Sequence, residues 1–292
     1  MTLRGVASVG FAFLALFVTG CGRRNPSIII GSESSTEESV FGEIVAQHVE
    51  QRLGFKVSRR PNVGGALLAY QALQNGEINV YPEYSGTIIT EILKEPPATS
   101  PDQVFERAKG EMARIAQADL IGPLGVENPF VAVVRVSHPA APGISSLSEA
   151  AQISGGWKLA YSYQFQQQSD GMPALTQYHL PMQVPMRAME ADDLYKSMED
   201  GESTMIIGRN TDGALKSKDW KTLADDRKLF TPEQLCLVAR QDILRAEPRL
   251  AGVLGELVGK LSNAKMRELN AQVDVDHRTP ADVAKDFLAA LK

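Results

Sequence analysis

From residue 28 onward, hydrophobic and polar positions follow first a strand-like and then a helical period. Residues 28–30 are an unbroken run of isoleucine, which predicts a buried strand ended by the glycine and serine that follow. Between residues 40 and 53 the apolar side chains recur at helical spacing, and a glycine follows the last of them. Ser35 stands three residues before Glu38, the arrangement of a capping box at a helix start. The pattern predicts a strand followed by a helix.

The same alternation of periods continues beyond this helix. Residues 55–57 alternate as in a strand, residues 64–76 form a second helical pattern opened by two glycines, and residues 78–81 form another short strand. This order is typical of right-handed βαβ units on a mainly parallel sheet. Ligands of such sheets bind beyond the carboxyl ends of the strands. Residues 32–35 and 81–87 are therefore candidate binding loops.

The rest of the chain also alternates between strands and helices. Apolar runs predict strands at residues 130–134, 157–161, 205–207 and 235–239. Helical patterns and caps predict helices at residues 146–151, 192–198, 249–261, 263–270 and 280–291. Residues 164–171 are polar and lack a period, which predicts a loop. The sequence therefore indicates an α/β protein.

The first residues form a separate hydrophobic segment. Residues 6–18 are uncharged and mostly apolar, follow a start with one cation, and lead into Val18-Thr19-Gly20-Cys21. This arrangement is typical of an export signal and is short for a transmembrane span. The tetrapeptide resembles a bacterial lipobox, which implies a signal peptide over residues 1–21, lipidation of Cys21 and a tether at residues 22–27. A plain N-terminal anchor and a signal without lipidation are the alternatives.

The composition fits a globular protein with a sizeable core. Of the 292 residues, 43% are hydrophobic and 22% are charged, and the formal net charge is −5. A nucleic-acid partner is not indicated, because it requires a basic face. Besides Cys21 the chain has one cysteine, Cys236, whose apolar surroundings predict a buried core residue. If Cys21 is lipidated, no disulfide forms within the chain, so an exported protein must depend on its core for stability.

Common metal and catalytic motifs are missing from the sequence. The four histidines are scattered and form neither a His-Glu-x-x-His motif nor a Cys/His set, so no metal site is predicted. There is no Gly-x-Ser-x-Gly elbow, and Gly64-Gly65 lacks the lysine of a phosphate-binding loop. No cofactor is expected. Carboxylates are plentiful, but nothing in their spacing indicates an acid–base pair.

The most specific stretch of the chain is Tyr81-Pro82-Glu83-Tyr84-Ser85-Gly86-Thr87. It resembles the Tyr-Pro-Glu-Tyr-Thr-Gly-Thr segment of the glycine betaine, choline and carnitine binding proteins of ABC-type osmoprotectant importers. Other segments resemble this family in the same order, from about residue 28 to residue 291: residues 30–37, 64–65, 76–79, 128–135, 211–213 and 269–276.

This resemblance implies a two-lobed type II periplasmic-binding fold. One lobe would contain residues 28–129 and 233–292, the other residues 130–232, and two crossover strands would form a hinge. A small-molecule ligand binds between the lobes and closes them, and the closed form docks on an ABC permease in the membrane. The resemblance thus implies an extracytoplasmic binding protein, not an enzyme. We further expect a monomer, held at a membrane by lipidated Cys21.

Relatives that bind quaternary amines hold the cation in a box of aromatic rings, whose electron-rich faces attract it. By resemblance, Tyr84 supplies one ring and Thr87 a nearby hydroxyl, while Phe130 replaces a second tyrosine. Arg209 and Glu233 stand where a third and a fourth tyrosine are expected. The pocket implied by the resemblance therefore departs from the aromatic box of the family.

Two cationic positions depart as well: Glu33 replaces a lysine and Gln168 replaces an arginine that would hold the ligand's carboxylate. Losing both cations weakens the case for glycine betaine, whereas Glu33 and Glu233 supply acceptors for N–H donors. Arg209 is suited to bind a carboxylate or phosphate through two parallel hydrogen bonds. We therefore expect a zwitterion or a polar cation with N–H groups, held by these three residues.

In this hypothesis the rings of Tyr84 and Phe130 stack on the ligand. Structural alternatives exist for several of the residues. In these alternatives, Arg209 and Glu233 pair only with each other, Tyr84 is a core tyrosine, and Glu33 stabilises a helix N-terminus.

Three functions are compatible with these residues. The first is a transport binding protein, which predicts reversible binding without turnover. The second is an extracytoplasmic sensor that uses the same fold and signals to a membrane partner. The third is an enzyme that uses Glu33 and Glu233 in the cleft, which requires a carboxyl group with a raised pKa. The resemblance favours the first.

Overall fold

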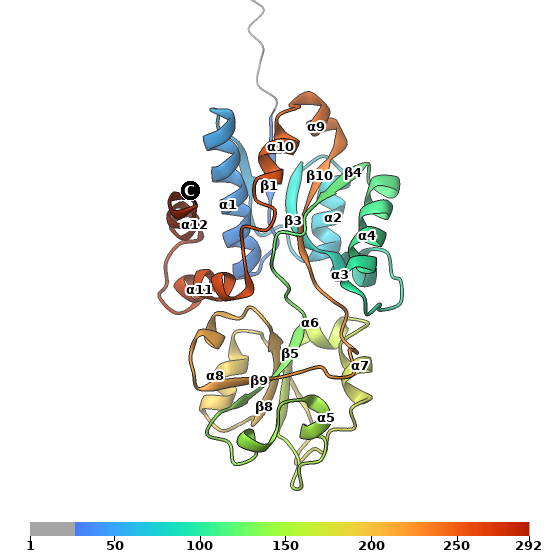
Figure 1. Cartoon of the computed structure of the whole chain (residues 1–292), viewed down its shortest axis with the longest axis vertical. Coiled ribbons are helices and arrows are strands. Elements are labelled where there is room, and N and C mark those ends of the chain that lie inside the picture. Colours follow the sequence, from blue (N-terminus) through green and yellow to red (C-terminus); the bar gives the residue numbers. More distant parts are fainter. Residues whose placement is uncertain (1–26, 292) are drawn as a thin grey trace, which may run out of the picture.

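The computed structural model describes residues 27–291, which form two lobes stacked along the long axis of the molecule (Figure 1). Each lobe contains a five-stranded sheet with helices packed on it. The predicted signal peptide and Cys21 lie outside the described residues. Within residues 27–291, none of the helices is both long and apolar enough to cross a membrane.

The sheet of the first lobe has the strand order β2-β1-β3-β10-β4. Its strands are β1 (Ile29–Gly31), β2 (Ser58–Arg60), β3 (Val80–Tyr84), β4 (Ala118–Ile121) and β10 (Leu235–Arg240). β1 is parallel to β2 and β3, as expected of βαβ units, but β10 is antiparallel to both β3 and β4. β1, β2, β3 and β4 thus run in one direction, as predicted for a mainly parallel sheet, and β10 is the exception because it returns from the other lobe and enters the sheet from the opposite end.

Helices cover both faces of this sheet. They are α1 (Thr36–Leu53), α2 (Ala66–Gln74), α3 (Ser85–Thr87), the π-helical turn η1 (Ile88–Ile92), α4 (Pro101–Ile115), α9 (Gln241–Ala246), α10 (Leu250–Gly255), α11 (Asn263–Asp274) and α12 (Pro280–Ala290). α1, α10, α11 and α12 pack on one face, and α2 and α4 pack on the other. Alternate residues of β10 face the two cores, and Cys236 is buried in the second, as its apolar surroundings predicted.

The start of α1 contains half of the predicted capping box, because the carboxyl group of Glu38 does not bond back to the cap. The side chain of Ser35 accepts a hydrogen bond of 3.1 Å from the backbone N–H of Glu38. Gly54 ends the helix in the left-handed conformation, with a φ of 79° that a glycine adopts without steric cost. These two caps fix where α1 begins and ends. The first turn of the helix faces the second lobe (Figure 1).

The sheet of the second lobe has the order β7-β6-β8-β5-β9. Its strands are β5 (Phe130–Arg135), β6 (Leu159–Ser162), β7 (Arg187–Met189), β8 (Met205–Arg209) and β9 (Trp220–Leu223). Its helices are η2 (Ala141–Gly143), α5 (Leu147–Ala150), α6 (Tyr163–Gln167), α7 (Met172–Thr176), α8 (Asp193–Glu199) and η3 (Gly213–Lys216).

The structure corrects two local predictions. Residues 164–171 were expected to be a loop, but α6 occupies the first half of them because Ser162 caps the backbone N–H of Phe165 and the Phe165 ring is buried. Residues 81–87 were expected to form one loop after a strand. Instead β3 continues to Tyr84, since β10 pairs with it along this stretch, and α3 begins directly after it.

The two lobes meet in a polar seam as well as at the crossover segments. In the crossovers, the backbone N–H of Asn128 donates to the carbonyl of Glu233 at 2.8 Å. In the seam, η3 of the second lobe lies against α11 of the first, so closely that a Cβ on Gly213 would be 2.7 Å from the backbone nitrogen of Ala271. Arg267 of α11 donates two hydrogen bonds of 2.6 Å to Asn210. The lobes are therefore in direct contact on the α11 side.

Candidate ligand-binding site

The seven predicted site residues come from both lobes and from the segments between them. Glu33 lies between β1 and α1, Tyr84 ends β3, and Thr87 ends α3. Phe130 begins β5, Gln168 follows α6, and Arg209 ends β8. Glu233 lies in the crossover that leads into β10. The ends of these strands and helices and the crossover before β10 lie where the two lobes meet (Figure 1).

Arg209 and Glu233 form the centre of this arrangement. A guanidinium nitrogen of Arg209 lies 3.9 Å from Oε1 of Glu233, a loose ion pair. The closer partners of Arg209 are the carbonyl oxygen of Asn128 at 3.1 Å and Oε1 of Gln168 at 3.2 Å. The Arg209 guanidinium also stacks on the ring of Phe130, with its central carbon 3.7 Å from the ring centroid. The ion pair between Arg209 and Glu233, considered as an alternative from the sequence, therefore exists, but it is only one of four contacts of the guanidinium.

Glu233 is held in place by the first lobe. The backbone N–H of Thr87 donates to its carboxyl group at 3.0 Å, and the Thr87 hydroxyl donates at 3.2 Å. Gly86 allows this approach, because a Cβ there would lie 2.5 Å from the carbonyl oxygen of Pro232 and 2.8 Å from Oε2 of Glu233. Burial raises the pKa of Glu233 to about 8, and Arg209 opposes the shift.

Tyr84 has a mixed position. Its backbone N–H donates to Oε1 of Glu83 at 2.7 Å, and its ring packs against the α1-side core of the first lobe. The ring is only partly buried. Tyr84 therefore borders the site while also serving as a packing residue, which combines the two possibilities considered from the sequence.

Two further carboxyl groups, Glu38 and Glu83, join Glu33 and Glu233 in what we call the carboxyl cluster. The pKa of Glu33 rises to about 7 because of burial, although a hydrogen bond with Glu83 and the charge of Arg209 oppose the shift. The pKa values of Glu38 and Glu83 lie well above their usual range, first because both are buried and second because the neighbouring carboxylates repel their charge. Among the charges that shift the pKa values of these four carboxyl groups, only that of Arg209 is positive.

Sequence reasoning missed Glu38 and Glu83. Glu38 was interpreted only as part of a helix cap, and Glu83 only as part of the family motif. A positional signal was available for Glu83, which lies within residues 81–87 at the carboxyl end of β3. Glu38 lies in the first turn of α1, three residues beyond the predicted loop at residues 32–35.

Glu37 forms a separate polar group beside the cluster. Its carboxyl group accepts hydrogen bonds from the side chains of Asn128 at 3.2 Å, Asn270 at 2.7 Å and Thr211 at 2.5 Å. Asn128 lies in a crossover, Asn270 on α11 and Thr211 in the second lobe, so Glu37 joins three separate segments. Burial raises its pKa to about 7, while the hydrogen bonds from Thr211 and Asn270 oppose the shift.

A cleft of about 530 Å³ lies between the lobes and leads to Arg209 and Phe130. The first lobe contributes Thr36 and the end of α11, and the second lobe contributes β8, α8 and the start of α6. The volume is within the range of small-molecule sites, roughly 300–1,000 Å³. This cleft gives a small solute access to Arg209, which lies 3.9 Å from Glu233 of the carboxyl cluster.

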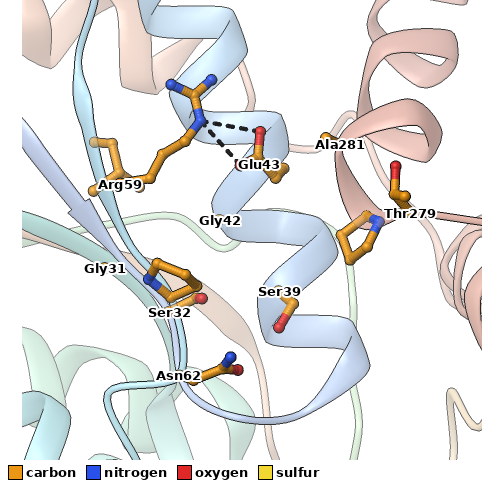
Figure 2. Close-up of a pocket in the computed structure, with 12 residues that line it drawn as sticks. Gly31, Ser32, Ser39, Gly42, Glu43, Arg59, Asn62, Thr279 and Ala281 are labelled. Carbon is orange, nitrogen blue, oxygen red and sulfur yellow. Dashed lines mark hydrogen bonds and ion pairs between the residues drawn. The ribbon is translucent and has the colours of Figure 1, made fainter.

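A second hollow, of about 240 Å³, lies within the first lobe between α1, β1 and the start of α12 (Figure 2). Its charged side chains, Glu43 and Arg59, point toward each other and form an ion pair of 2.9 Å. Because these charges neutralise each other, the hollow offers less to a charged ligand than the interlobe cleft does. As for metals, residues 27–291 contain no group of three or more His, Cys, Asp or Glu side chains arranged to hold an ion.

Comparison with known proteins agrees with this geometry. Residues 26–290 match the family model described as the substrate binding domain of ABC-type glycine betaine transport system. The chain belongs to this family. The resemblance seen in the sequence is thereby confirmed, together with the function it implied, a substrate-binding protein of ABC transport.

Three curated relatives of this family illustrate its range. The carnitine transport binding protein OpuCC of Listeria monocytogenes serotype 1/2a (strain 10403S) is 24% identical over 94% of this chain and 92% of its own. The glycine-betaine-binding protein of Pseudomonas aeruginosa is 25% identical over 98% of this chain and 94% of its own. The ergothioneine transport permease/ergothioneine binding protein EgtU of Helicobacter pylori (strain G27) is 27% identical over 90% of this chain but only 47% of its own.

Solved structures confirm the two-lobed type II fold. The crystal structure of a glycine betaine/carnitine/choline ABC transporter superimposes with a TM-score of 0.82 at 24% identity, covering 90% of this chain and 98% of that one. Lactococcal OpuAC, in its closed-liganded conformation with glycine betaine, gives a TM-score of 0.60 at 14% identity, covering 91% and 96%. At such identities the likeness concerns the fold, so ligand preference has to be argued from the residues of this cleft.

Proposed function

We propose that this binding protein captures a small cation or zwitterion in the interlobe cleft and delivers it to an ABC permease without changing it chemically. The observation that carries the proposal is the buried carboxyl cluster beside Arg209, the side chain that itself lines the cleft. Buried carboxylates are costly unless a positive group or hydrogen-bond donors compensate them. A positively charged ligand group supplies that compensation.

The proposed site consists of Glu33, Thr87, Gln168, Arg209 and Glu233, bordered by Tyr84 and Phe130. We further propose that the lobes divide at residues 129/130 and 232/233, where the crossovers lie, and that ligand binding stabilises the closed arrangement. The protein would act outside the cytoplasm as a monomer, anchored by lipidated Cys21. The names of the curated relatives, which are transport binding proteins, favour this role over a sensor or an enzyme.

Thermal-shift measurements on the purified protein provide the test. We expect betaines, amino acids or polyamines at millimolar concentration to raise the melting temperature, because a ligand that binds only the folded state stabilises it. Succinate and glucose serve as anionic and neutral controls and should have no effect. Recovery of the ligand unchanged after incubation would agree with binding without turnover.

A matched pair of variants locates the effect. Glu233→Gln should remove most of the shift, whereas Glu95→Gln should keep it, because Glu95 forms an ion pair with Arg107 on the first lobe, away from the cleft. A response to the anion or the sugar alone, or conversion of the ligand to a product, would contradict the proposed function.

A further inference from the structure

The ring of Phe130 is already covered by a positive group of the protein itself. The guanidinium carbon of Arg209 lies 3.7 Å from the ring centroid. The ring is 4% exposed, and its other neighbours are the rings of Phe165 and Phe230, with centroids 4.7 Å and 6.0 Å away. A ligand cation therefore has no access to the face of Phe130 unless Arg209 moves away.

Several acceptors hold Arg209 in that position. The carbonyl of Asn128, the side-chain oxygen of Gln168 and the carboxyl group of Glu233 lie around its two terminal nitrogens. A guanidinium prefers to stack its flat face on an aromatic ring and to donate hydrogen bonds within its own plane, and Arg209 does both. Moving it would break these contacts together, so the arrangement disfavours any ligand that needs the ring.

Unused acceptors lie nearby, in the carboxyl cluster. Glu38 is 4% exposed, and within residues 27–291 neither of its carboxyl oxygens has a hydrogen-bond partner. The charges that act on it are those of Glu33, Glu37 and Glu233, so its carboxyl group faces other acids and not a cation. A buried carboxyl group with two free oxygens is suited to a ligand that brings positive charge together with N–H donors.

We infer that Arg209 occupies the aromatic cation subsite from within the protein, and that the ligand's positive group binds to the carboxyl cluster instead. The ligand class is then an ammonium, amidinium or guanidinium that carries N–H bonds. A trimethylammonium group has no N–H to donate to Glu38, and the Phe130 ring is not free for it to stack on. This inference rests on the proposed function and specifies which cations the same cleft takes.

Ligand pairs that differ only in methylation of the nitrogen test the inference. The pairs are ethanolamine and choline, glycine and glycine betaine, and 4-amino-3-hydroxybutanoate and carnitine, titrated calorimetrically into the wild-type protein. We expect the unmethylated member of at least one pair to bind at least about tenfold tighter than its partner, since each charged hydrogen bond that it gains strengthens binding by about that factor or more.

Variants of Arg209 separate its role from that of the cluster. Arg209→Ala uncovers the Phe130 ring and should reduce the preference for the unmethylated member by at least about tenfold, as the ratio of the two dissociation constants. Arg209→Lys keeps a cation near the ring and should retain most of the preference, although binding is weaker overall. The ratio corrects for any general loss of affinity in either variant.

The outcomes distinguish the inference from the function on which it rests. Tighter binding of the methylated member by the wild type overturns the inference and leaves the proposed function intact. Binding of no pair member contradicts the inference, and it contradicts the proposed function as well if no other amino acid or polyamine raises the melting temperature. An unchanged ratio of dissociation constants in Arg209→Ala overturns the role of Arg209.

A crystal structure of the wild-type protein with the best-binding amine is a second test, which does not depend on the folding of any variant. Its nitrogen must lie within about 3.2 Å of Glu38 or Glu83, and a nitrogen placed on the Phe130 ring overturns the inference.

Discussion

Replacing Glu37 by alanine is expected to destabilise the ligand-free protein by about 3–4 kcal/mol, because it removes the common acceptor of several buried donors. The side chains of Asn128, Asn270 and Thr211 all donate to this carboxyl group. Water does not readily replace it, since Glu37, Thr211 and Asn270 are buried. The three donors also belong to different segments, so the seam between the lobes should loosen. Equilibrium unfolding in urea measures the first effect, and small-angle scattering without ligand measures the second.

Glu43→Ala is the matched control for this experiment. Glu43 lies on the same helix and forms an ion pair with Arg59, but both side chains are partly exposed to solvent, at 21% and 31%. Partly exposed pairs of this kind contribute within about 1 kcal/mol. Equal stability losses in the two variants, or an unchanged scattering profile in Glu37→Ala, would show that Glu37 does not join the lobes.

The stability of the ligand-free protein is expected to fall by about 3 kcal/mol or more between pH 5 and pH 8. The pKa values of Glu33 and Glu37 are raised from 4.5 to about 7, and that of Glu233 to about 8. In the unfolded chain these groups lose their protons near pH 4.5, whereas the folded protein retains them to higher pH. Their contribution is therefore complete below pH 4.5 and is lost as the pH rises through 7 to 8.

Burial is the main cause of these raised pKa values, and the charged groups near the carboxyls adjust them and so change the size of the stability loss. Arg209 lowers the pKa of Glu33, Glu37 and Glu233, while Asp212 raises that of Glu37 and Asp170 raises that of Glu233. Urea unfolding at pH 5, 6, 7 and 8 measures the dependence, and Glu38→Gln should make it shallower because it removes a buried carboxyl group whose own pKa is raised. Stability that stays constant or rises over this range would show that the cluster is not protonated when the cleft is empty.

Much of the fold could be predicted from the sequence because local signals agreed with the tertiary structure. The cap at Ser35, the glycine after residue 53 and the apolar stripe of α1 all indicate the same helix, and the structure contains it. The direction of β10 could not be predicted, because strand pairing depends on where the chain returns from the second lobe. α6 was missed because one buried ring, Phe165, and one cap are enough to form a short helix in a polar segment.

The site could be predicted only where the resemblance supplied residue positions. Glu33, Arg209 and Glu233 were identified as departures from the family pattern, and the structure brings the two carboxyl groups near Arg209, which lines the cleft. Their partners were harder to predict. Nothing in the linear sequence indicates that Arg209 stacks on Phe130, since this contact depends on the register in which β5 pairs with β8. For the same reason Glu38 appeared to be only a cap residue until the neighbouring carboxyl groups were placed around it.

In the empty protein the carboxyl groups that would hold the positive group of the ligand are protonated, so binding of a cation should release protons. Calorimetry of the tightest-binding amine at pH 7, in two buffers with different ionisation enthalpies, counts these protons. We expect the release of about one proton per ligand, because a bound cation lowers the pKa of the nearby carboxyl groups. Binding with no proton release anywhere between pH 6 and pH 8 would contradict it.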